Sequence, residues 1–169
     1  MPKWLDVNGP VLANTVYVDN KLSAKDTSIT LPEIAFTTAE FKAMGALSLP
    51  IFSQIDNMET TIHKVGIDLG LLNMLTLEPK TLETRFALDV LKADGSTKAV
   101  GAKAFLRVVP NKIPSLAGEP GAAVESDATF ATTRYQLFVD GEEYWLIDKL
   151  AQIVRIHGVN YYDKIASLL

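Results

Sequence analysis

The sequence predicts a mainly β fold, an antiparallel β-sandwich or barrel with one internal α-helix and a short C-terminal helix. Three observations support this prediction. Most of the chain divides into strand-like segments separated by turn residues. Asp-Gly pairs at 94–95 and 140–141 each separate two such segments, which is typical of β-hairpins. Residues 67–77 place leucines at helical spacing and form the best internal helix, so we expect few helices.

Length and composition limit the range of functions. The 169 residues fit a single domain, 1–169. The net charge is −4, and no run of lysine or arginine is present to attract phosphate, which disfavours electrostatic binding of nucleic acid. The absence of cysteine excludes disulfides and thiolate metal sites. Neither a signal peptide nor a membrane-length apolar run is recognised, so we expect a soluble protein made in the cytoplasm.

The first half of the chain is expected to contain an arm, several strands and the helix. Residues 1–13, with Pro2, Gly9 and Pro10, are typical of an arm with little regular structure. Strands are expected at 16–19, 27–31, 34–42 and 58–65. In the last of these, one face should carry the side chains of Met58, Thr60, Ile62 and Lys64.

Residues 44–57 have an unusual composition for a loop. They contain Gly45 and Pro50, but only one charge, at Asp56. Their apolar side chains are Leu47, Leu49, Ile51, Phe52 and Ile55. Two interpretations are equally supported: a loop that folds over its own core, or a loop that contacts another subunit, since large exposed apolar patches mark interaction sites.

Two long strands, 81–92 and 97–109, should form a hairpin. A three-residue loop, Asp94 to Ser96, would place Phe86 opposite Ala104 and Leu88 opposite Ala102. A two-residue loop would place the same apolar residues opposite Lys103 and Gly101, so the apolar match favours the longer loop.

The second hairpin is the most informative feature. A long strand at 124–139 follows a proline-rich loop at 110–123, and a two-residue turn at Asp140-Gly141 would set Leu137 opposite Tyr144 and Tyr135 opposite Leu146. The opposite face would then mix polar with large apolar groups: Arg134, Gln136, Phe138, Glu143, Trp145 and Ile147. A sheet that covers one monomeric core has a mostly polar second face. We therefore expect a neighbouring subunit to complete this sheet.

The C-terminus should add a strand at 153–156 and a helix, capped by Asn160, that runs to Leu169. We find no catalytic, cofactor or metal site in the sequence. His63 and His157 lack the spacing of metal ligands. Glu142 and Glu143 are neighbours in a strand and point to opposite faces, so they cannot share a substrate. The sequence therefore predicts a protein that is not an enzyme.

Several segments resemble one family in order and spacing. They are Asn14–Asp19, Ile29–Ile34, Ala39–Gly45, Tyr135–Glu143, Ile147–Asp148 and Gly158–Asn160. From about residue 14 to the end, the chain resembles the major tail tube proteins of contractile-tailed phages and of R-type phage-tail-like bacteriocins. It departs from that pattern after Gly45, where it is more apolar, at His157 and Asn160, where the family commonly has Asn and Asp, and in its additional first 13 residues.

The resemblance implies a subunit of hexameric rings that stack into a hollow tube inside a contractile sheath. The implied partners are further copies of the chain, the tail sheath protein, baseplate or initiator proteins and the tail terminator. DNA would pass through the lumen of a true phage without specific binding. The implied location is the host bacterial cytoplasm during synthesis, then the virion tail or released particle, with no membrane in the assembled state and no cofactor.

The residues expected to contact neighbouring subunits are Leu31, Pro32, Leu47, Leu49, Ile51, Phe52, Ile55, Tyr135, Phe138, Tyr144 and Trp145. The segment 44–57 would act as the ring-contact loop. Two alternatives remain open. One is the inner tube protein of a type VI secretion-like injection system, which has a similar fold. The other is a small ligand-binding β-barrel whose pocket is lined by Phe86, Leu88 and Phe105.

Overall fold

The structure is a computed structural model, and it describes residues 6–169 apart from the side chain of Asn8. The fold is mainly antiparallel β with two short helices, as the sequence predicts. In chain order the elements are β1 (Val7–Val18), β2 (Lys21–Lys25), β3 (Ile29–Thr30), β4 (Phe36–Lys42), β5 (Ala46–Ile55), β6 (Glu59–Val65), α1 (Leu69–Leu75), β7 (Lys80–Leu91), β8 (Thr97–Pro110), β9 (Glu125–Val139), β10 (Glu142–Asp148), β11 (Ile153–Ile156), β12 (Val159–Asn160) and α2 (Asp163–Ala166).

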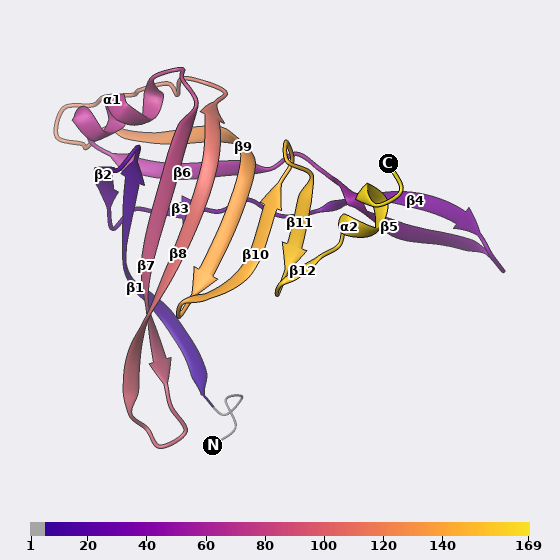
Figure 1. Ribbon diagram of the computed structural model, residues 1–169. Helices are drawn as coiled ribbons and strands as arrows, with labels where there is room; N and C mark the ends of the chain where they lie inside the picture. Colours follow the sequence, from indigo (N-terminus) through magenta and orange to yellow (C-terminus); the bar gives the residue numbers. More distant parts are fainter. Residues whose placement is uncertain (1–5) are drawn as a thin grey trace.

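One ten-stranded sheet builds the body of the molecule. Eight strands follow the order β12-β11-β10-β9-β8-β7-β1-β2, while β6 branches from β9 and pairs with β3. The long strand β9 makes this possible, because its first half pairs with β6 and its second half with β10. Figure 1 shows β6 and β3 crossing behind β7 and β8. The sheet thus folds into two layers that enclose a core.

The core lies between these layers. Its largest fully buried side chains include Met58, Ile62, Leu82, Leu106 and Phe130, which come from both layers. The predicted shared face of 58–65 is confirmed, and the structure shows that it points inward, since Met58, Thr60, Ile62 and Lys64 are all buried. Alternation with period two places each of them on the same side of β6.

The N-terminal prediction is wrong for residues 7–13. They form the first half of β1, which pairs with β7 from Val7↔Leu91 to Val18↔Leu82. The strand β2, which we did not predict, pairs with β1 on its other side. The first half of β1 depends on an edge that β7 supplies from more than 60 residues away in sequence, so local sequence signals do not reveal it. The strand β2 instead follows β1 through the two-residue turn Asp19-Asn20, where both residues have positive φ. Residues 1–5 of the predicted arm lie outside the described residues.

The β7–β8 hairpin has the predicted faces but a different register. Phe86 pairs with Ala102 and Leu88 with Val100, two positions away from the prediction. The backbone N–H of Lys92 donates to Ser96 O at 2.8 Å, so the three-residue loop is 93–95, and Gly95 supplies the required positive φ of 85°. Because the shift is an even number, every side chain keeps its predicted face.

The β9–β10 hairpin keeps its predicted turn but contains a bulge. Val139 pairs with Glu142 as expected, and the register then shifts between Glu143 and Trp145. The predicted pairs of Leu137 with Tyr144 and of Tyr135 with Leu146 are therefore wrong, and the observed partners are Trp145 and Ile147. A bulge adds one residue to a strand and exchanges the faces beyond it.

The two helices are shorter than predicted. Asp68 caps α1 by accepting a hydrogen bond from the backbone N–H of Leu71 at 3.0 Å. The residue before α2 is Tyr162, so Asn160 is not its cap; the Asn160 side chain instead accepts from the backbone N–H of Tyr162 at 3.1 Å. Within residues 6–169, neither helix is long and apolar enough to cross a membrane.

Candidate subunit interface

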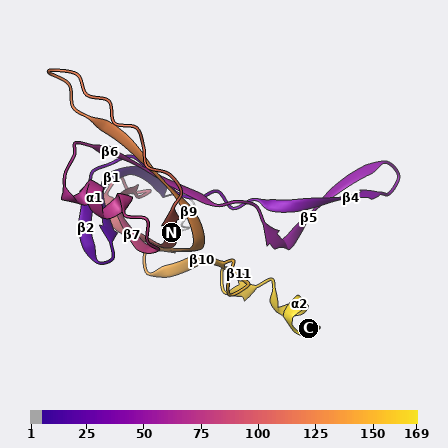
Figure 2. The same cartoon turned by 90° about the horizontal axis from the view of Figure 1, so that it is seen from above.

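The β4–β5 hairpin stands apart from the body of the molecule. Its strands pair with one another in a separate two-stranded sheet, and Figures 1 and 2 both show it projecting well beyond the ten-stranded sheet. The predicted loop at 44–57 is therefore wrong, because residues 46–55 form β5. A lone two-stranded hairpin is marginally stable in water and leaves its backbone edges unpaired.

The two faces of the hairpin differ in chemistry. Ala39 pairs with Leu49 and Phe41 with Leu47, so these side chains share one apolar face. The other face carries Thr38, Glu40, Lys42, Ala46, Ser48 and Pro50. The exposed fractions of Phe41 and Leu49 are 53% and 45%. The apolar face is thus open to solvent in the single chain.

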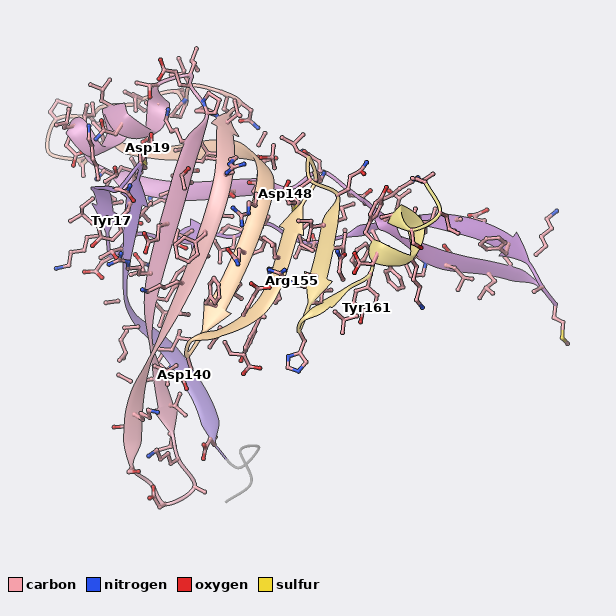
Figure 3. The ribbon with its side chains drawn as sticks, viewed as in Figure 1. Tyr17, Asp19, Asp140, Asp148, Arg155 and Tyr161 are labelled. Atoms are coloured by element: carbon pink, nitrogen blue, oxygen red, sulfur yellow. The ribbon has the colours of Figure 1, made fainter. Side chains whose placement is uncertain are left out.

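An aromatic cluster ties the base of the hairpin to the C-terminal segment. The ring of Phe52 lies 5.2 Å from that of Phe36 and 5.9 Å from that of Tyr161, measured between centroids. Figure 3 shows Tyr161 beyond β11, on the side of the sheet toward the hairpin. Nearby, the ammonium group of Lys149 donates to the backbone O of Asp56 at 2.7 Å. The base is therefore anchored, whereas the tip is not.

The face of the main sheet that points away from the core, here called the uncovered face, carries an ion pair that connects neighbouring strands. Arg155 Nε donates to Glu143 Oε1 at 2.7 Å, and Gln136 Nε2 donates to Glu143 Oε2 at 2.8 Å, so this carboxylate joins β9, β10 and β11. The hydrogen bond from Arg155, assisted by that from Gln136, holds the pKa of Glu143 below its usual value. Arg155 and Asp148 lie on this face (Figure 3). The same face also carries the edge-to-face pair Phe105–Phe138.

The bulge in β10 weakens the prediction of a sheet that is apolar on both faces. It moves Trp145 and Ile147 to the face of Tyr135, which belongs to the core. The uncovered face is therefore more polar than the sequence suggests. Exposed apolar side chains lie on the β4–β5 hairpin, at Phe41, Leu47, Leu49 and Phe52.

The structure separates the predicted contact residues into three groups. Leu47, Leu49, Phe52 and Tyr144 are exposed. Half-buried positions are Leu31, Ile51, Ile55, Phe138 and Trp145. Pro32 and Tyr135 are buried within the chain itself and cannot reach a neighbour in this fold. Tyr135 packs against Trp145 with ring centroids 5.6 Å apart, and burial raises its pKa to about 12.

Sequence reasoning missed two residues of the candidate interface. Phe41 completes the apolar face of the hairpin, and Tyr161 closes its base. Phe41 could have been found from its place two residues after Ala39 in a predicted strand. Tyr161 could not, because its contact with Phe52 spans more than 100 residues of sequence.

Chemical alternatives gain no support from the geometry. His63 Nδ1 bonds to Asp127 Oδ1 at 2.7 Å across β6 and β9, and no group of three or more potential ligands in residues 6–169 is placed to hold a metal. The alternative of a ligand pocket lined by Phe86, Leu88 and Phe105 is wrong. Phe105 pairs with Glu83 and lies on the same face of the sheet as Glu83, whereas Phe86 and Leu88 lie on the opposite face.

Comparison with known proteins supports one family. The sequence model of the phage tail tube protein FII family matches residues 11–169. No curated protein matches. Three cryo-EM structures share the fold, and the first is the sheath-tube complex of the PVC extracellular contractile injection system in its extended state, with a TM-score of 0.54, 15% identity, and coverage of 77% of this chain and 90% of the other. The second is the sheath/tube terminator of the same system, with a TM-score of 0.53, 17% identity, and coverage of 76% of this chain and 95% of the other. The third is the tube-terminating cap of the anti-feeding prophage, with a TM-score of 0.52, 15% identity, and coverage of 77% of this chain and 90% of the other.

Proposed function

Since the chain belongs to the phage tail tube protein FII family, we propose that it is the inner tube subunit of a contractile phage tail or tail-like injection particle. Hexameric rings of the chain stack into a hollow conduit inside a sheath. The role is structural, and we assign no catalysis to it.

One observation carries this proposal: the β4–β5 hairpin is a separate sheet with an exposed apolar face. Folding of a single chain does little to stabilise such a hairpin, because its apolar side chains remain exposed to water. Assembly supplies the missing burial. The hairpin then bridges successive rings, while the ten-stranded sheet forms the wall.

The neighbouring structures suggest the further partners. They contain a tube inside its sheath, a sheath/tube terminator and a tube cap. By analogy, this tube would contact a sheath protein on its outside, an initiator at one end and a terminator at the other. In a true phage the lumen would pass DNA without specific binding, in accord with the net charge of −4 and the ion-paired, uncovered sheet face.

Sedimentation and negative-stain imaging of the purified chain test the proposal. A tube subunit forms rings or tubes with increasing protein concentration. A species that stays monomeric or dimeric over the whole concentration range would overturn the tube assignment and support a binding protein instead. A type VI secretion-like inner tube is the alternative within the same architecture, and sheath and baseplate genes beside the gene for this chain distinguish the two.

A further inference from the structure

The short helix α1 is mostly apolar, with Asn73 as its one polar side chain. It carries no charged residue and buries only Leu71 and Met74. On the helix and its flanks, four large side chains expose more than half of their surface: Ile67, Leu69, Leu72 and Leu77. Large apolar side chains exposed together mark interaction sites. We call these four residues the α1 patch.

The apolar face of the β4–β5 hairpin has the same character. The strand β5, which supplies Leu47 and Leu49, contains no charged residue over its ten positions. The chain as a whole is 21% charged. Two uncovered apolar surfaces thus occur on one molecule.

The two surfaces lie at opposite ends of the molecule. Figures 1 and 2 agree in placing α1 at one end and the hairpin tip at the other. A single chain therefore cannot bring them together. We propose that the apolar hairpin face of one copy packs against the α1 patch of the next copy.

A second copy is the occupant that the electrostatics favours. Joining two apolar surfaces takes few ionic groups out of water, whereas covering either one with a charged surface would leave desolvated charges unpaired. The charged residues beside the contact are Glu40 and Lys42 on the other hairpin face, Asp68, which is paired with Lys64 at 3.1 Å, and Glu78, which follows Leu77. Each copy supplies one apolar hairpin face and one α1 patch, so the two kinds of surface are present in equal numbers.

Such a contact is heterologous, because different surfaces of identical chains meet. Heterologous contacts continue from copy to copy, and they close into rings or extend into filaments. The inference rests on the proposed tube function and deepens it by naming the two surfaces that join. Both surfaces belong to the described part of the chain.

Disulfide cross-linking can test this contact, because the chain contains no cysteine and only introduced thiols can react. The double variant Leu49→Cys/Leu72→Cys is assembled under reducing conditions, oxidised mildly and run on a non-reducing gel. We expect a ladder of disulfide-linked multimers. The matched control, Leu49→Cys/Val159→Cys, places the second thiol at a similarly exposed position (55% for Val159 and 59% for Leu72) on the last strand of the sheet, and it should give no ladder.

The outcomes separate this inference from the proposed function. If wild-type chain forms no rings or tubes, the proposed function fails. If the double variant assembles but gives no ladder, the hairpin–α1 contact is wrong and the tube function stands. If only the double variant fails to assemble, Leu49→Lys and Leu72→Glu decide: each variant alone should abolish assembly, and an equal mixture should restore it. A mixture that does not assemble also overturns the contact.

Discussion

Gly70 of α1 approaches the backbone of β2 so closely that a Cβ at this position would lie 2.2 Å from Ser23 O. This contact sets the distance between the helix and the edge of the sheet. A glycine that lowers the intrinsic helix propensity of the segment is therefore required by packing.

We predict that Gly70→Ala destabilises the chain. The new methyl group must displace the helix from β2, and overpacking of this kind costs about 1–3 kcal/mol. Thermal unfolding measures the effect. Gly101→Ala is the matched control, because no atom lies within 4 Å of a Cβ built there. Equal melting temperatures for the two variants would contradict the packing argument.

Phe41→Ser should block assembly while leaving the folded chain intact. Phe41 lies on the apolar face near the hairpin tip and is 53% exposed, so its loss removes no core packing. Sedimentation should show the variant as a small species with an unchanged melting temperature. Lys42→Ser, on the polar face of the same strand, should still form rings and tubes. Normal tubes from Phe41→Ser would remove the hairpin face from the interface.

Substitution of Asp68 should separate its two roles. Its carboxylate caps α1 at Leu71 N and pairs with the buried Lys64, and these hydrogen bonds, the backbone one first, lower its pKa. Asp68→Asn keeps a capping oxygen and loses the charge, whereas Asp68→Ala loses both. We expect Asp68→Ala to be less stable than Asp68→Asn by about 1 kcal/mol, the usual value of an N-cap. Denaturant titration of both variants measures the difference.

Acid should weaken the junction of β9, β10 and β11. The pKa of Glu143 is lowered in the folded chain, mainly by Arg155. A depressed carboxyl pKa contributes stability above its unfolded value, here 4.5, and that contribution is lost as the pH falls through the folded value. The effect is modest because the Arg155 side chain is 38% exposed.

Melting curves between neutral pH and pH 3 test this assignment. Wild-type protein should lose more stability on acidification than Glu143→Gln, in which the amide cannot titrate. Glu119→Gln serves as the control, since Glu119 lies in the exposed loop after β8 and should leave the pH profile of the wild type unchanged. Identical pH profiles for wild type and Glu143→Gln would contradict the role of Glu143.

Much of the local structure follows from sequence pattern. The inward face of 58–65, the helix within 67–77 and the turn at Asp140-Gly141 all agree with the structure. These features depend on neighbouring residues alone: alternation with period two, spacing with period 3.6, and the positive φ of a turn. The family resemblance also agrees with the match over residues 11–169.

The candidate interface could be predicted only in part from sequence pattern. The apolar content of 44–57 pointed to a contact segment, but its strand conformation depends on pairing with β4. Pro32 and Tyr135 are among the expected contact residues, but both are buried in the folded chain.

The amino-acid pattern is enough to predict a mainly β chain without thiol chemistry, in which residues 44–57 carry more apolar surface than a solvated loop needs. The faces beyond the β10 bulge, the pairing of residues 7–13 with β7, and the placement of two apolar surfaces at opposite ends of the molecule emerge only in the folded chain. The physical reason is the range of the interactions. Periodicity and turn chemistry act over a few residues, whereas register, bulges and exposure depend on partners that only the folded chain brings together.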